Sequence, residues 1–142
     1  MEINNVVMKE IETEQELKEV LELCYSILGT GNAELYGYDA WYKRFTDGAQ
    51  PLVYGQKDNK VVSAVLGRAE NKDSLVIGFV ACHEDYRKQG ITKRLLSYFE
   101  DIAREKGFKY ITLGSESDTF YEKCGYELIF QVHDQNIFQK TL

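Results

Sequence analysis

The chain has 142 residues, of which 44% are hydrophobic and 28% are charged, a composition typical of a soluble globular domain. Its 17 Lys and Arg against 23 Asp and Glu give a net charge of −6, which argues against general nucleic-acid binding because most of the surface would repel phosphate. No apolar run approaches the ~18 residues of a membrane span, and the N-terminus lacks the regions of a signal peptide. We expect one cytoplasmic domain over residues 1–142, with no nucleic-acid or membrane partner.

The three cysteines are far apart in the sequence. None belongs to a Cys-x-x-Cys pair or lies near a cluster of histidines, so neither a disulfide framework nor a zinc site is predicted. We expect each to be a small buried hydrophobic residue. They are Cys24, Cys82 and Cys124.

The first part of the chain predicts a strand and an amphipathic helix. Val6–Ile11 forms the short strand, and Thr13 with Glu16 three residues later forms a capping box for the helix. Gly29 and Gly31 end the helix. Its expected buried face consists of Leu17, Val20, Leu21, Cys24 and Leu28.

Aromatic side chains dominate residues 33–45, which predict a second, shorter helix ending near Asp47 and Gly48. Aromatic residues at this spacing usually pack against a core. The alternative is that this segment lines a substrate pocket, where Glu34 and Asp39 would favour a cationic amine. The aromatic residues are Tyr36, Tyr38, Trp41, Tyr42 and Phe45.

The middle of the chain predicts three strands. Residues 52–56 and 60–69 form a hairpin around a turn at 57–59, and a second turn at 70–73 leads into a strand at Leu75–Cys82. Gly78 inside that strand predicts a bulge or a close backbone approach, with a simple packing concession as the alternative.

A basic turn and a long helix follow this strand. Apolar residues at helical spacing begin at Ile91, and the helix ends at Gly107. Four basic residues crowd its N-terminus, where the helix dipole makes each cation unfavourable by roughly 0.3–1 kcal/mol. A bound anion would compensate them, and Gly90 lets a ligand approach the free backbone amides. We interpret residues 87–92 as a phosphate or pyrophosphate site; the alternative is a solvated basic helix start. The basic residues are Arg87, Lys88, Lys93 and Arg94.

The C-terminal part predicts a strand at 110–113, a brief helix capped within Ser115–Asp118, and two strands at 126–132 and 137–142 linked by a turn at 133–136. The element order predicts an α/β (α+β) sheet, antiparallel at the hairpins and parallel across the helical crossovers. The final strand could be an edge for a second copy, so monomer and homodimer both stay open.

Two motifs in this order make the chain resemble the GNAT superfamily of acyl-CoA-dependent N-acetyltransferases. The first, Val80–Thr92, resembles the family's strand followed by (Arg/Gln)-x-x-Gly-x-(Gly/Ala). The second, Phe120–Tyr126, resembles its Phe-Tyr-x-Lys-x-Gly-Phe segment. The resemblance covers nearly the whole chain. It implies a mixed, mostly antiparallel sheet of about six to seven strands with helices on both faces.

The same resemblance implies acetyl-CoA as co-substrate, no metal, and a small-molecule or peptide amine as acceptor. Tyr121 would protonate the departing thiolate; a phenol with a pKa of about 10 is a reasonable donor to a thiolate whose conjugate acid lies near 8.5. The alternative is that Tyr121 packs in the core. The implied cofactor site comprises the strand backbone of Val80, Ala81 and Cys82, the amides of Arg87, Lys88, Gln89, Gly90, Ile91 and Thr92, and also Ser117 and Phe120.

Two departures from the family pattern bear on function. Thr92 stands where Gly or Ala is usual, and the strand at Leu75–Cys82 lacks the carboxylate that some members use as a base. The remaining base candidates leave three readings open: an N-acetyltransferase that uses direct attack by a primary amine, a CoA-binding sensor or regulatory module that has lost the chemistry, and an anion site for another nucleotide. The base candidates are Glu70, His83, Glu84 and Glu116.

Overall fold

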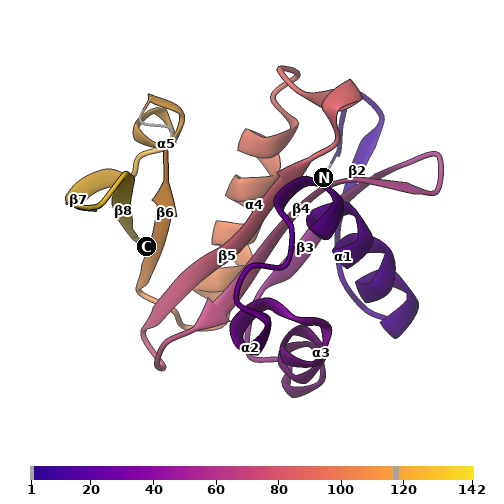
Figure 1. Ribbon diagram of the computed structural model, residues 1–142. Helices are drawn as coiled ribbons and strands as arrows, with labels where there is room; N and C mark the ends of the chain where they lie inside the picture. The colour runs from indigo at the N-terminus through magenta and orange to yellow at the C-terminus, as the bar shows by residue number, and fades with distance from the viewer. Residues whose placement is uncertain (1, 117–118) are drawn as a thin grey trace.

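Within the part of the chain that the computed structural model describes, residues 2–116 and 119–142, eight strands join in one sheet of order β1-β2-β3-β4-β5-β6-β8-β7 (Figure 1). Every neighbouring pair is antiparallel except β5 and β6, which are parallel. The predicted fold class is therefore confirmed, and the two-residue β1 is an addition to the strands expected. The strands are β1 Glu2–Ile3, β2 Val6–Glu10, β3 Leu52–Lys57, β4 Lys60–Ala69, β5 Ser74–Cys82, β6 Tyr110–Ser115, β7 Glu127–Val132 and β8 Gln135–Thr141.

Helices cover both faces of the sheet. Helices α1 (Glu14–Leu28), α2 (Ala33–Tyr36) and α3 (Tyr38–Asp47) lie in front of it in Figure 1, and α4 (Ile91–Glu105) lies behind. Each side has its own apolar core, one built around α4 and the other around α1 and α3. A 3₁₀ turn, η1 (Glu84–Tyr86), and the short α5 (Thr119–Lys123) complete the elements. No helix in the described part of the chain has the length and apolar character to cross a membrane.

Local sequence signals set the start of α1 as predicted. The Thr13 hydroxyl accepts the Glu16 amide at 3.1 Å, and the Glu16 carboxylate accepts the Glu12 amide at 3.2 Å. The predicted buried face is wrong at one position, because Leu28 keeps 48% of its surface exposed while Leu23 is buried. Leu28 lies in the last turn, where the helix has run past the edge of the core.

The helix predicted over 33–45 is two helices. Gly37 has extended backbone angles, φ −73° and ψ 170°, and separates α2 from α3. Its amide still bonds to the Ala33 carbonyl at 2.9 Å, so Gly37 ends one helix and precedes the next. The predicted core packing of the aromatic segment is confirmed at Trp41, which is fully buried.

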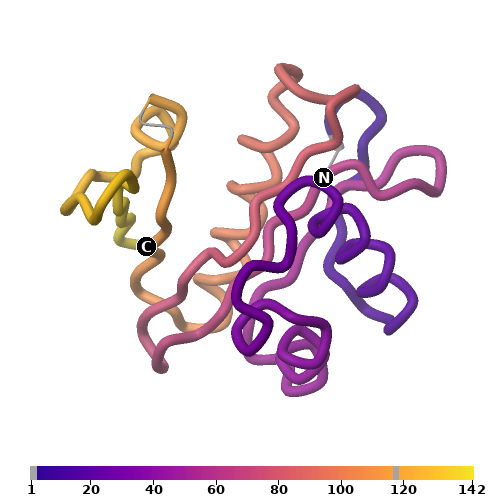
Figure 2. Tube along the Cα trace, in the orientation of Figure 1, coloured from indigo at the N-terminus to yellow at the C-terminus, as the bar shows by residue number. Residues whose placement is uncertain are grey.

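Strands β5 and β6 pair only at their beginnings and then part, as the trace in Figure 2 shows. The pairs run from Ser74 opposite Tyr110 to Val76 opposite Thr112. Against β4 the register shifts where Leu66 faces Phe79 and Gly67 faces Ile77, which leaves Gly78 as the extra residue of a bulge. A bulge bends its strand and increases the local twist, and here it lies two residues beyond the last pair with β6.

The bulge also exchanges the two faces of β5. Leu75 and Ile77 belong to the core on the α4 side, whereas Phe79 and Ala81 belong to the core on the α1 side. In a regular strand with no bulge, these four alternate residues would all point to the same face of the sheet. The prediction of a bulge at Gly78 is therefore confirmed.

The C-terminal hairpin differs from prediction in its turn and its edge. His133 and Asp134 alone form the turn, because Gln135 and Asn136 already pair within β8. Strand β8 lies between β6 and β7. The last strand of the chain is therefore interior to the sheet, and β7 is the edge; the predicted edge was wrong because β8 returns beside β6.

Candidate functional site

A cleft of about 300 Å³ opens where β5 and β6 part. Its walls come from the ends of β5 and α1, the turn before α4, the first turn of α4, and α5. The cleft therefore brings together both sequence motifs, whose first residues, Val80 and Phe120, lie 40 positions apart in the chain. The lining residues are Ile27, Val80, Ala81, Cys82, Arg87, Thr92, Phe120 and Tyr121.

A second cavity, of about 250 Å³, adjoins the cleft at the N-terminus of α4. The two share Arg87, Thr92 and Phe120. Lys88 and Gly90 have positive φ angles, 62° and 80°, and turn the chain tightly into the helix. The first amides of a helix have no intrahelical acceptor, so this cavity offers N–H groups and positive charge to an anion.

The residues of the predicted anion site differ in the hydrogen bonds that they already form and in the cavity that they line. The Arg87 amide points to the Glu84 carbonyl at 3.5 Å, and the Arg87 Nε donates to the Cys82 carbonyl at 3.1 Å. The side chain of Gln89 donates to the Asp85 carbonyl at 3.2 Å and lines neither cavity. Three other residues of the predicted site, Lys88, Gly90 and Ile91, line the second cavity. Ser117, also predicted for this site, lies outside the described residues.

Tyr121 lies on α5 with only 8% of its surface exposed, and it lines the cleft. Its ring contacts Tyr126 edge-on at 5.9 Å between centroids and Phe138 at the same distance. Burial, with a smaller contribution from Cys124, raises the pKa of Tyr121 to about 12. The phenol is therefore protonated at neutral pH. Tyr121 thus packs in the core and also contributes to the lining of the cleft.

None of the four base candidates, all of them described residues, lines the cleft with Tyr121. Glu70 is paired with Arg68, and Glu116 is exposed after β6. His83 accepts the Asp85 amide on Nδ1 at 3.1 Å. This bond places the proton of the neutral imidazole on Nε2, so His83 offers a donor rather than a lone pair on its other nitrogen. Glu84 lies at the start of η1, next to His83.

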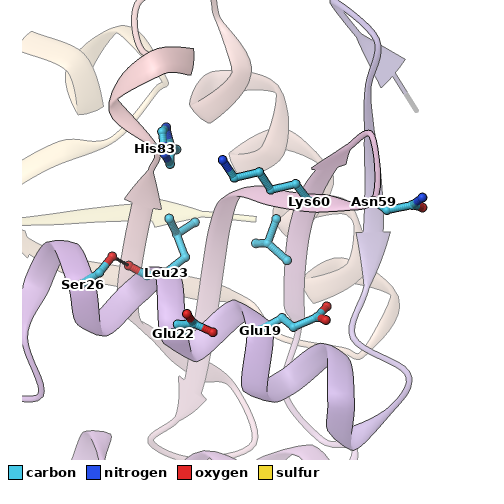
Figure 3. A pocket seen from close by; sticks show the side chains of 8 residues that line it. Glu19, Glu22, Leu23, Ser26, Asn59, Lys60 and His83 are labelled. Carbon is cyan, nitrogen blue, oxygen red and sulfur yellow. Dashed lines mark hydrogen bonds between the residues drawn. The ribbon is translucent and has the colours of Figure 1, made fainter.

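A groove of mixed charge continues from the cleft along α1. Ile27 and Arg87 connect the cleft to a hollow of about 360 Å³. This hollow shares Leu23, Ser26 and His83 with a further one of about 330 Å³. Figure 3 shows the outer hollow, where Glu19 and Glu22 project from α1 while Lys60 and His83 lie on the opposite wall.

The described residues contain no group of three or more His, Cys, Asp or Glu side chains that could hold a metal ion. Comparison with curated protein sequences found no match. The model of the acetyltransferase (GNAT) family matches residues 14–126, which span both sequence motifs, the cleft and the cavity at α4. The chain belongs to the GNAT family.

Solved structures with the same fold include several acetyltransferases. An acetyltransferase from Streptococcus agalactiae 2603 has a TM-score of 0.76 and 19% identity, over 99% of this chain and 100% of that one. An aminoglycoside 6'-N-acetyltransferase complexed with coenzyme A has a TM-score of 0.78 and 14% identity, over 95% and 96%. The PaiA N-acetyltransferase of Thermoplasma acidophilum, in complex with coenzyme A, has a TM-score of 0.78 and 14% identity, over 96% and 99%. At these identities the likeness shows a shared GNAT fold.

One residue of this GNAT cleft was missed by sequence reasoning. Ile27 lines it from the C-terminal end of α1, with 37% of its surface exposed. The available signal was an apolar residue off the predicted buried face of an amphipathic helix, which the sequence alone does not separate from an ordinary surface residue.

Proposed function

We propose that this GNAT protein is an N-acetyltransferase that transfers the acetyl group of acetyl-CoA to a primary amine by direct attack. The observation that carries the proposal is the joining of three features in one cavity system: the free edge of β5, the basic amide-rich start of α4, and the buried phenol of Tyr121. The proposed acceptor is a small molecule or a peptide, the proposed location is the cytoplasm, and the proposed assembly is a monomer or a homodimer.

The cavity system offers backbone groups that can bind acetyl-CoA. Beyond Val76, β5 has no backbone pairs with β6, so this edge of the strand at residues 80–82 can pair with the pantetheine arm as an added strand would. Two carbonyls of this segment already accept a side chain, Ala81 from the Ser63 hydroxyl and Cys82 from Arg87 Nε. The amides of residues 88–92 can hold the pyrophosphate. Gly90 keeps this approach open, because a Cβ there would meet only the Ile3 side chain, at 3.7 Å.

Acetyl-CoA supplies a thioester whose carbon–sulfur bond breaks as the bond from the amine nitrogen to the carbonyl carbon forms. Tyr121 donates its phenolic proton to the leaving sulfur, which avoids release of a thiolate into an apolar site. As the amide forms, the attacking nitrogen loses one proton, which restores the phenol of Tyr121 through water. An acceptor that arrives as an ammonium must lose one further proton before it attacks, and no carboxylate on β5 takes it. We therefore propose that the acceptor enters neutral or loses that first proton to water in the groove along α1.

Replacing Tyr121 by Phe tests this assignment. We expect kcat for thiol release to fall by about a hundredfold or more, since a general acid contributes 10²–10⁴-fold, while the Kd for CoA changes by less than about twofold. Thiol release against a panel of amines and calorimetry with CoA measure the two quantities. Tyr42→Phe is the matched control, since Tyr42 lies on α3 with 39% of its surface exposed. Full activity of the Tyr121 variant with an identified amine would refute the role.

The second candidate function is a CoA-binding sensor. It is favoured by one observation, that the base candidates His83 and Glu70 are engaged in other contacts. Tight CoA binding with no thiol release across a broad amine panel would support the sensor. One amine turned over at a useful rate would decide for the enzyme.

A further inference from the structure

A small basic pocket lies beside the proposed pyrophosphate cavity, between α4 and α5. Its volume is about 160 Å³. Lys93 reaches it from the first turn of α4, and Lys123 from the end of α5. Ser97, Glu100, Cys124 and Lys140 complete its polar lining.

Two of the charged groups in this pocket neutralise each other. Lys140 Nζ donates to Glu100 Oε1 at 2.9 Å and to the Cys124 carbonyl at 2.8 Å. The second oxygen of Glu100 accepts the Tyr126 hydroxyl at 2.7 Å. Glu100 is only 5% exposed, so its carboxylate is already fully engaged and Lys140 is held in place.

Lys93 and Lys123 are the remaining charges, and both are exposed. Neither forms a salt bridge with a carboxylate of residues 2–116 or 119–142. Lys93 also lies where the helix dipole disfavours a cation. In a chain with a net charge of −6, two unneutralised lysines that face one small pocket form a local site for an anion.

The position of the pocket identifies that anion. Lys93 lines both this pocket and the cavity at the start of α4, and Phe120 lines that cavity and the cleft of Tyr121. The three spaces therefore follow one another along the ends of α4 and α5. In coenzyme A, the thiol arm, the pyrophosphate and the ribose 3′-phosphate follow one another in the same order.

We propose that Lys93 and Lys123 bind the 3′-phosphate of coenzyme A and make this chain selective for CoA over 3′-dephospho-CoA. The inference rests on the proposed function, since it takes CoA as the ligand of the adjoining cavities. Lys140 does not contact the phosphate directly; its contacts to Glu100 and Cys124 hold the wall against which the phosphate lies.

Calorimetric titration of the full chain with CoA and with 3′-dephospho-CoA tests the proposal. We expect the wild type to bind CoA about tenfold more tightly, the contribution of charge-assisted bonds to one phosphate. The double variant Lys93→Ala/Lys123→Ala should bind both ligands with equal affinity, within about twofold, because it loses about tenfold more affinity for CoA than for 3′-dephospho-CoA. The single variant Lys123→Ala, at a residue that lines only the small pocket, should weaken CoA binding and keep the wild-type affinity for 3′-dephospho-CoA. Lys43→Ala is the control, because Lys43 is an exposed lysine on α3 and its replacement removes one positive charge elsewhere on the surface. This variant should keep the tenfold preference for CoA.

The outcomes separate this site from the proposed function. Equal binding of both ligands by the wild type, or an equal loss for both ligands in the double variant, would overturn the 3′-phosphate site and leave CoA binding intact. Failure of the wild type to bind either ligand would overturn the proposed function together with the inference. A preference that weakens as salt rises from 50 to 500 mM would support the charge-based site, because exposed charges are screened.

Discussion

At Gly78, the absence of a side chain lets two aromatic rings approach the backbone of the bulge. A Cβ at this position would lie 2.8 Å from Tyr36 Cε1 and 3.0 Å from Trp41 Cη2. Trp41 is fully buried and stacks on Tyr36 at 6.0 Å between ring centroids, so it has little room to shift. Gly78 therefore fixes the position of α3 against β5, close to where the cleft begins.

We expect Gly78→Ala to destabilise the fold by about 1–3 kcal/mol, the usual cost of overpacking a core. The free energy of unfolding in urea measures it. Gly114→Ala is the matched control in β6, because the nearest atom there, Gln135 Oε1, is the end of an exposed side chain that can move. If both variants lose the same stability, the close contact at Gly78 is not what constrains that position.

Among the elements, the five-residue helix α5 carries the proposed general acid Tyr121, and it is anchored at its C-terminal end. Lys140 on β8 bonds to the Cys124 carbonyl and to Glu100 on α4. Tyr126, next to α5, bonds to the same carboxylate and packs against Tyr121. A buried ion pair thus connects the helix of the phosphate cavity, the helix of Tyr121 and the sheet.

We expect Lys140→Met to lower the free energy of unfolding by about 3 kcal/mol, because it leaves the Glu100 carboxylate buried without its cation. The double variant Lys140→Met/Glu100→Gln should recover at least half of that loss, since Gln carries no charge and still accepts from Tyr126. Lys109→Met is the control, because Lys109 faces Asp73 at 3.9 Å with 67% of its side chain exposed, and such pairs contribute about 0–1 kcal/mol. Equal losses for Lys140→Met and Lys109→Met would contradict the anchoring role.

At the scale of the whole molecule, several weak acids are buried in the neutral form. Burial raises the pKa of Cys24 to about 12. Burial and then Cys124 raise the pKa of Tyr121 to about 12, and burial and then the Glu100 charge raise the pKa of Tyr126 far above its usual range. In the unfolded chain these groups ionise near their ordinary pKa values, about 8.5 for Cys and 10 for Tyr. Folding therefore favours the protonated forms.

We expect the stability contributed by these groups to be fully present below about pH 8.5 and to be lost as pH rises toward 12. Between pH 10 and 12 the unfolded state binds fewer protons, so the free energy of unfolding falls by up to about 1.4 kcal/mol per pH unit for each group. Urea unfolding at several pH values, with a reductant present, measures this slope. Tyr121→Phe should make the slope shallower by one group, with Tyr42→Phe as the control. An unchanged slope for Tyr121→Phe would show that Tyr121 does not contribute to the alkaline loss.

Local signals in the sequence were sufficient for much of the fold. The capping box at Thr13, the hairpin turn predicted at residues 57–59, and the apolar period of α4 depend on neighbouring residues. They were predicted close to their observed bounds, the turn being one residue shorter than expected. The same holds for the two motifs, since a tight turn at Gly90 and a helix N-terminus are local structures. The break at Gly37 was not predicted, because a glycine within a helical pattern is often tolerated.

What the sequence determined by itself was the order of the elements and the chemical character of the turn at residues 87–92. The tertiary structure alone decided that β6 leaves β5 after Val76, that Ile27 lines the cleft, that β7 is the edge, and that Lys93 and Lys123 line one pocket. The physical reason is that the spacing of residues along the chain determines which face of its own helix or strand a side chain lies on. Whether that side chain contacts a residue of another element depends on where a bulge bends a strand and where a buried ion pair holds a helix.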